Sequence, residues 1–202
     1  PAVNFLHRSK RPVAVFYFGA FFSLYVFLAG GSNAVKTFWK NIIPAALTAW
    51  GTGSSVATIP ANLAAAEKNG VPKDISEVVI PIGATIHMEG SCLAAIVKIS
   101  LLFGIFHMDF SGPGTLLTAI GISILAGTVM SGIPGGGFIG ELLIVTMYGF
   151  PIQALPIISM VGTIVDPPAT MVNSVGDNVS SMMVARILGA PNGEKWMQKS
   201  TA

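Results

Sequence analysis

A long apolar stretch lies near the start of the chain, between residues 12 and 30. This stretch, PVAVFYFGAFFSLYVFLAG, contains no Asp, Glu, Lys or Arg. A helix of this length, with a rise of about 1.5 Å per residue, crosses a hydrocarbon core of about 30 Å. The pattern therefore predicts a membrane-spanning helix, the end of a scaffold, within a first segment at residues 1–34.

Residues 35–70 are also largely apolar, but a small polar tip divides them. The tip, TAWGTGSSVATIP, separates two arms of about 12 to 15 residues, each roughly 20 Å long as a helix. Neither arm can cross a bilayer alone, so the pattern predicts a re-entrant helical hairpin. Residues 112–149 repeat the pattern, with the tip SGIPGGG at 131–137. A bilayer tolerates such tips only where they are buried in protein or line a wet cavity.

Each predicted hairpin is followed by a longer apolar segment with an interruption in its middle. In residues 74–107 the interruption is GATIHMEGS, at 83–91, and in residues 152–190 it is GTIVDPPAT, at 162–170. Adjacent prolines remove hydrogen bonds from a helix interior, which favours a break at the second position. We therefore expect two broken transmembrane helices.

The order of hairpin and broken helix thus occurs twice in the chain. It predicts an all-α polytopic membrane protein with two inverted repeats, each a re-entrant helical hairpin plus a broken transmembrane helix. Residues 35–190 would form a transport domain and residues 191–202 a cytoplasmic tail. Duplicated discontinuous helices are typical of transporters, whose binding sites lie near the bilayer midplane where the repeats meet.

The composition of the chain supports a membrane location. Its 202 residues are 52% hydrophobic and 10% charged, with a mean hydropathy of +0.71, whereas soluble domains are about 25% charged. A net charge of +2 is too small to indicate a nucleic-acid partner. The single cysteine, Cys92, excludes a disulfide framework and a Cys-based metal site. We expect a multi-pass protein of the inner or plasma membrane, in contact with lipid.

Three carboxylates lie in apolar surroundings at predicted membrane depth: Glu89, Asp166 and Asp177. A central acid costs about 2.5 to 3.5 kcal/mol on insertion scales, so such residues are usually functional. The structural alternative is a position at a helix end near the lipid headgroups. Asn173 and Asp177 share a helix face because they are four residues apart. Together with Glu89 they would form an oxygen-rich cage for a monovalent cation such as sodium.

Other polar positions have two interpretations each. His87, beside the predicted break, is either a proton carrier near neutral pH or a neutral histidine hydrogen-bonded to the other repeat. Ser54 and Ser55 either offer donors to a ligand or cap the return arm of the hairpin. The glycine-rich second tip is either a mobile lid or a surface for close helix packing.

These motifs, in this order, resemble one known family. The serines of the first tip followed by ATIP, the break PIGATIHMEGS, the tip GIPGGG and the last helix DPPATMVNSVGDN are similar to the dicarboxylate/amino acid:cation symporters, the glutamate and neutral amino acid transporter superfamily. The resemblance covers about residues 12 to 190. It implies an elevator-type transport domain without the N-terminal scaffold helices, within a homotrimer. It implies no cofactor other than a coupling ion.

The resemblance also implies roles for individual residues. Asp166 would bind the amino group of the substrate, while Asn173 and the tip serines would bind its α-carboxylate. The implied substrate contacts are Ser54, Ser55, Ser91, Ile133, Gly137, Asp166, Thr170 and Asn173. The implied cation ligands, for sodium or for proton coupling, are Gly83, Thr85, His87, Met88, Glu89, Asn173 and Asp177.

The chain departs from the family pattern in two respects that bear on function. Members that carry acidic substrates use an arginine for the distal carboxylate, but Ala169 and Gly53 stand where that arginine occurs, which favours a neutral substrate. The family's Asn-Met-Asp-Gly-Thr break is His-Met-Glu-Gly-Ser at 87–91 here. Because histidine replaces an oxygen ligand, sodium and proton coupling both stay open.

The sequence therefore predicts a secondary active symporter, not an enzyme, that moves a small carboxylate-bearing solute by an elevator-type mechanism. The solute would be an amino acid, including a neutral one, or a dicarboxylate, and the coupling ion would be sodium or a proton. One alternative is a passive channel, since re-entrant hairpins also build selectivity filters. The other is an intramembrane hydrolase, although the chain contains no G-x-S-x-G motif.

Overall fold

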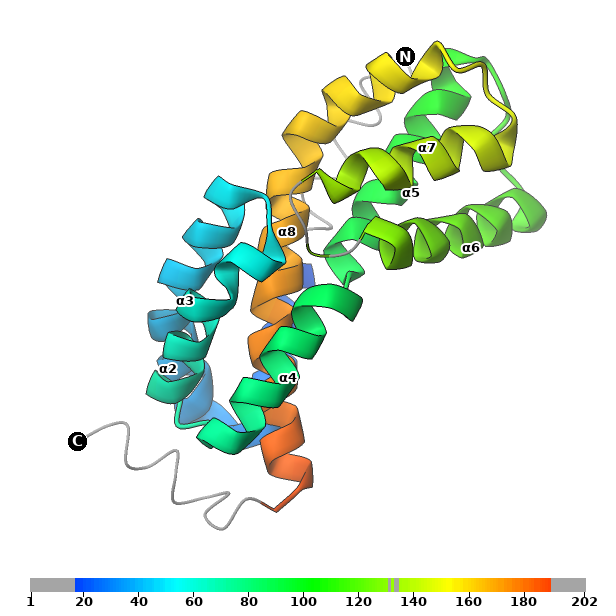
Figure 1. Cartoon of the computed structure of the whole chain (residues 1–202). Helices are drawn as coiled ribbons and strands as arrows, with labels where there is room; N and C mark the ends of the chain where they lie inside the picture. Colours follow the sequence, from blue (N-terminus) through cyan, green and yellow to red (C-terminus); the bar gives the residue numbers. More distant parts are fainter. Residues whose placement is uncertain (1–16, 131, 133–134, 190–202) are drawn as a thin grey trace.

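The computed structural model describes residues 17–130, 132 and 135–189. These residues form helices and loops, with no strand among them, which confirms the all-α prediction. The elements are the π-helical turn η1 (Tyr17–Phe21) and the helices α2 (Phe22–Thr52), α3 (Ser55–Lys68), α4 (Lys73–Ile86), α5 (Glu89–Ile105), α6 (Pro113–Met130), α7 (Gly136–Tyr148) and α8 (Ala154–Ile187) (Figure 1). The predicted tail at 191–202 lies outside the described residues.

Helix α2 contains the boundary between the predicted spanning helix and the first hairpin. Gly31 has φ 78° and ψ −170°, a backbone conformation outside the helical region that is essentially restricted to glycine. The helix is therefore kinked there. Its second part, residues 32–52, forms the first arm of the hairpin and α3 forms the return arm, with Gly53 and Ser54 between them.

Helices α4 and α5 form one interrupted segment between the two hairpins, the second of which consists of α6 and α7. The interruption consists of His87 and Met88. Their backbone angles are not helical, with ψ 87° at His87 and ψ 41° at Met88. The structure thus has a break within the predicted range 83–91, and the two helix ends that it creates lie at the centre of the molecule (Figure 1).

The second predicted interruption, at 162–170, is wrong, because α8 is continuous through Pro167 and Pro168. The two prolines have no N–H for the carbonyls of Thr163 and Ile164, which lie four residues earlier. Both of these residues are exposed, so the carbonyls are freed at the surface rather than in the core. The helix bends instead of ending. Figure 1 shows α8 changing direction between its yellow first half and its orange second half.

The helices pack into two lobes, and α8 belongs to both. The first lobe consists of α2, α3, α4 and the second half of α8, with Phe38, Ile80 and Val175 in its hydrophobic core. The second lobe consists of α5, α6, α7 and the first half of α8, with Leu102 and Ile158 in its core. Each hairpin therefore packs against one half of the interrupted segment and one half of α8 (Figure 1).

Four stretches of the described chain are long and apolar enough to cross a membrane: Tyr17–Thr52, Lys73–Ile105, Pro113–Met130 and Ala154–Ile187. Large apolar side chains on these stretches point outward. Leu47, Leu117 and Ile164, for example, are each more than half exposed. An apolar outer surface on helices of this length suits lipid rather than water, as expected of a polytopic membrane protein.

Candidate transport site

The tips of the two hairpins meet at the centre of the molecule. The hydroxyl of Ser54 and the N–H of Val56 both donate to the carbonyl oxygen of Gly132, over 2.7 and 3.2 Å. Gly132 also lies so close to the carbonyl oxygen of Ala84 that a Cβ atom on it would collide with that oxygen. The second tip is thus bound to the first tip and packed against the end of α4.

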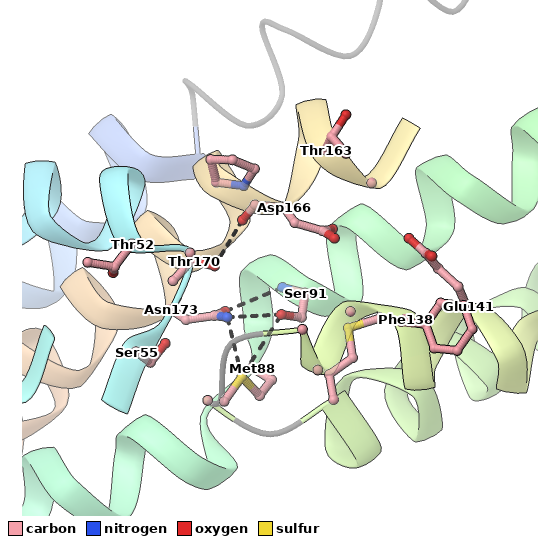
Figure 2. A pocket seen from close by; sticks show the side chains of 18 of the residues that line it. Thr52, Ser55, Met88, Ser91, Phe138, Glu141, Thr163, Asp166, Thr170 and Asn173 are labelled. Carbon is pink, nitrogen blue, oxygen red and sulfur yellow. Dashed lines mark hydrogen bonds between the residues drawn. The ribbon is translucent and has the colours of Figure 1, made fainter. Parts of the chain in front are cut away.

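Beside the tips lies a cavity of about 360 Å³, bounded by the start of α5, the start of α7 and the middle of α8. Its volume is typical of small-molecule sites. Six of the predicted substrate contacts line it, namely Ser55, Ser91, Gly137, Asp166, Thr170 and Asn173. Figure 2 shows the side chains of Ser55, Ser91, Asp166, Thr170 and Asn173 around it. Another predicted contact, Ile133, lies outside the described residues.

Ser54, the remaining predicted contact, is buried and points to the other hairpin rather than to the cavity. Its hydroxyl oxygen accepts a hydrogen bond from the N–H of Ala57 at 3.2 Å and so caps α3, while its O–H donates to Gly132. Of the two interpretations that the sequence left open for Ser54, the structure shows the cap of the return arm. The neighbouring Ser55 lines the cavity.

Asn173 binds α8 to the start of α5. Its side-chain oxygen accepts from the N–H of Gly90 at 2.7 Å and from that of Ser91 at 3.3 Å. Its amide group donates to Ser91 Oγ at 2.9 Å (Figure 2). The first turn of a helix carries partial positive charge on its N–H groups. The positive end of the α5 dipole therefore lies at this end of the cavity, with the N–H groups of Gly90 and Ser91 already bonded to Asn173.

Charged side chains from α5, α7 and α8 meet around Asp166, which lies two turns before Asn173 in α8. The Nζ atom of Lys98 donates to Glu141 Oε1 and to Asp166 Oδ1, each at 2.7 Å. Ser159 donates to the second oxygen of Glu141 at 2.5 Å. Glu141 and Asp166 line the cavity with their carboxylates toward one another (Figure 2), whereas Lys98 is fully buried. We call Lys98, Glu141 and Asp166 the lysine cluster. Sequence reasoning identified Asp166 but neither of its partners.

A second group of charged side chains lies at the interruption between α4 and α5. His87 Nδ1 is 3.1 Å from Asp177 Oδ1, and His87 Nε2 is 3.4 Å from Glu89 Oε2. The hydroxyl of Tyr17 donates to the same Glu89 oxygen at 2.6 Å. The other oxygens, Glu89 Oε1 and Asp177 Oδ2, are buried and have no hydrogen-bond partner among the described residues. We call His87, Glu89 and Asp177 the histidine cluster.

The remaining predicted cation ligands are arranged unevenly around the histidine cluster. Gly83 lies against the carboxylate of Asp177, too close for a Cβ atom. Met88 and Asn173 line the cavity and are in contact, with 3.3 Å between the Asn173 amide nitrogen and the Met88 sulfur. Thr85 is exposed and donates to a carbonyl of its own helix. No group of three or more His, Cys, Asp or Glu forms a metal site within the described ranges, so a bound cation would need backbone oxygens as well.

Two helical hairpins that meet at their tips beside a cavity, next to an interrupted helix, fit the class of polytopic secondary transporters. The sodium:dicarboxylate symporter family matches residues 12–187, and the chain belongs to this family. The family consists of transporters, not enzymes, which removes the hydrolase alternative. The protein is a multi-pass protein of a cell membrane.

Several curated relatives are similar to most of the chain. The neutral amino acid transporter B(0) of Mus musculus is 38% identical over 159 residues, which cover 76% of this chain and 28% of that protein. The excitatory amino acid transporter 2 of Homo sapiens is 32% identical over 167 residues, 82% of this chain and 29% of that protein. An excitatory amino acid transporter of Caenorhabditis elegans is 32% identical over 151 residues, which cover 73% of this chain and 29% of that protein. The chain thus spans less than a third of the length of these relatives.

Proposed function

We propose that the protein is a symporter that carries a small carboxylate-bearing solute, an amino acid, together with a monovalent cation. The observation that carries this proposal is a cavity with two chemically different ends. Asn173 and the start of α5 lie at one end, where a carboxylate is favoured, and the carboxylate of Asp166 lies at the other. A zwitterionic amino acid needs both ends. Family membership and relatives named as amino acid transporters support the same class of solute.

The histidine cluster is our candidate for the coupling site. The buried, unpartnered oxygens of Glu89 and Asp177 are suited to bind sodium, and the imidazole of His87 is suited to bind a proton. The cluster is connected to the cavity through Met88, which follows His87 in the chain and contacts Asn173. Asn173 itself lies one turn before Asp177 in α8. Binding of a cation would therefore affect the residues that hold the carboxylate end of the cavity.

Transport would occur by an elevator-type displacement in which both hairpins move together, within a homotrimer. The hydrogen bonds from Ser54 and Val56 to Gly132 support the joint movement, because they connect the two tips. The shared helix α8 supports it as well, since one half packs in each lobe. The homotrimer rests on the family resemblance, and a mass measurement of the purified full-length protein in detergent tests it.

An uptake experiment tests the proposed function. The natural full-length protein is reconstituted into liposomes, and labelled amino acids and dicarboxylates are offered under a sodium gradient and a pH gradient imposed separately. We expect saturable accumulation of an amino acid above its external concentration, and loss of accumulation when the driving gradient is collapsed. Equilibration that ignores both gradients would instead indicate a passive channel. No uptake of any solute, relative to protein-free liposomes, would contradict the proposal.

A further inference from the structure

Two members of the lysine cluster, Lys98 and Glu141, have no role in the proposed function. Lys98 is fully buried and donates to Glu141 and Asp166 at 2.7 Å each. Glu141 is buried as well, whereas the side chain of Asp166 is 33% exposed and lines the cavity. An ionised lysine inside a membrane protein is tolerated when carboxylates balance its charge, and here two of them contact it.

Two glycines leave room for the cluster. A Cβ atom on Gly162 would collide with Glu141 Oε1 and would lie 3.1 Å from Asp166 Oδ2 and 3.2 Å from Lys98 Nζ. A Cβ atom on Gly137 would lie 2.5 Å from Asp166 Oδ2. The helices α7 and α8 therefore approach the charged groups with no side chain between them. Glu141 and Asp166 lie in the cavity wall, and the buried Lys98 contacts both.

The charges of the cluster do not cancel. Two carboxylates and one ammonium group have a formal charge of −1. Among the described residues that line the cavity there is no lysine or arginine. Lys98 is not available to a ligand's carboxylate, because it is buried and donates to Glu141 and Asp166 already. One negative charge is left for a ligand, and Asp166 presents it.

We propose that Lys98 and Glu141 determine substrate specificity by setting this end of the cavity at one negative charge, so that it accepts an amino acid with a single ammonium group and excludes one with a second carboxylate. The inference rests on the proposed function and names the substrate class for it. Glu141 repels an acidic side chain, and Lys98 prevents the two carboxylates from attracting a second ammonium group. Lys98 is a positioning residue, since it acts on the substrate through Asp166.

The test changes the charge of the cluster and then restores it. In the natural full-length protein, Glu141→Gln gives the cluster a formal charge of 0 and Lys98→Met gives −2. The double variant returns to −1 with neither side chain charged. Binding of free glutamine, glutamate and ornithine is measured by titration calorimetry on the purified proteins. Gel filtration shows whether each variant is folded.

We expect the wild-type protein to bind glutamine with an affinity at least about tenfold higher than its affinity for glutamate or ornithine. Glu141→Gln should reduce the preference over glutamate by about tenfold. Lys98→Met should shift the preference toward ornithine, and the double variant should again prefer glutamine. The control is Lys73→Met with Glu77→Gln, an exposed pair 3.5 Å apart on α4, which should leave the selectivity unchanged.

Equal selectivity in the wild type and both single variants would overturn the inference, as would a double variant no more selective than the worse single one. A wild-type preference for glutamate would also overturn it, while the proposed function would stand. A wild-type protein that binds none of the amino acids would overturn the proposed function and this inference with it. If Lys98→Met alone does not fold, Glu141→Gln and the double variant decide the question.

Discussion

The lysine cluster and the histidine cluster have the same plan in different parts of the molecule. Each places one basic side chain between two carboxylates, one of which belongs to α8. Each also has a glycine of α8 against an oxygen of its glutamate. Gly162 lies against Glu141 Oε1, and Gly176 lies against Glu89 Oε1, with no room for a Cβ atom in either place. Both clusters therefore connect α5 to α8 through charged side chains.

The two clusters differ in how completely they are hydrogen-bonded. The ammonium group of Lys98 is 2.7 Å from both carboxylates, and Ser159 donates to the second oxygen of Glu141, whereas Tyr17 donates to the Glu89 oxygen that already faces His87. The imidazole of His87 is 3.1 and 3.4 Å from its carboxylates, and each carboxylate keeps one buried oxygen without a partner among the described residues. This difference supports the proposed roles, in which the satisfied cluster defines the substrate end and the unsatisfied cluster binds the cation.

The largest effect is expected from Asp177→Asn, which keeps the shape of the side chain and removes a charge from the unsatisfied cluster. Uptake driven by the cation gradient should fall to the level of protein-free liposomes, because a cation bound there loses one of its two carboxylates. The measurement is uptake under separate sodium and pH gradients. The matched control is Asp74→Asn, an exposed acid in the first turn of α4. Unchanged cation dependence in Asp177→Asn would remove this residue from the coupling site.

The next effect is expected from Asp166→Asn, the corresponding change in the satisfied cluster. The substrate's ammonium group loses its charged partner, so affinity for the amino acid should fall by about 30-fold or more. Affinity for the coupling cation, measured in the absence of substrate, should stay at the wild-type value. Titration calorimetry of the full-length protein measures both. Amino acid affinity equal to that of the wild type would show that the ammonium group binds elsewhere.

The elements of the fold that could be predicted are those marked by residues close together in the sequence. The break at 83–91 was visible because small and polar residues stand next to each other within an apolar segment. The break predicted at 162–170 rested on a local signal as well, but its outcome depends on the surroundings. A proline removes one hydrogen bond, and the helix continues where the freed carbonyls lie at the surface, as they do at Thr163 and Ile164.

The candidate site could be predicted only in part, because some of its contacts join distant helices. The shared face of Asn173 and Asp177 follows from their spacing. The bonds of Lys98 span 43 and 68 residues, and the packing of α5, α7 and α8 decides them. The sequence indicates only that a lysine and a glutamate at membrane depth need partners. Ser54 and its neighbour also show this limit, since the orientation of the tip decided which one lines the cavity.

A moderate effect is expected from Gly162→Ala and Gly176→Ala, which test whether the two clusters are separate. Each added methyl group would collide with a glutamate oxygen, so each variant should lose about 1–3 kcal/mol of stability. Thermal unfolding in detergent measures this loss, with Gly121→Ala in α6, which has open space around it, as the control. Gly162→Ala should weaken substrate binding and Gly176→Ala cation binding. The reverse assignment would contradict the separation of roles.

The smallest effect is expected from Lys73→Met, and it calibrates what burial adds to a lysine. Lys73 pairs with Glu77 at 3.5 Å on the surface of α4, with side chains 86% and 53% exposed, so its loss should change stability by about 0.5 kcal/mol or less. Lys98→Met leaves Glu141 and Asp166 without their shared cation and should cost about 3–5 kcal/mol. Thermal unfolding of the two variants side by side measures the difference. Equal losses would mean that Glu141 and Asp166 do not need the charge of Lys98, and that the formal charge of the lysine cluster does not control this end of the cavity.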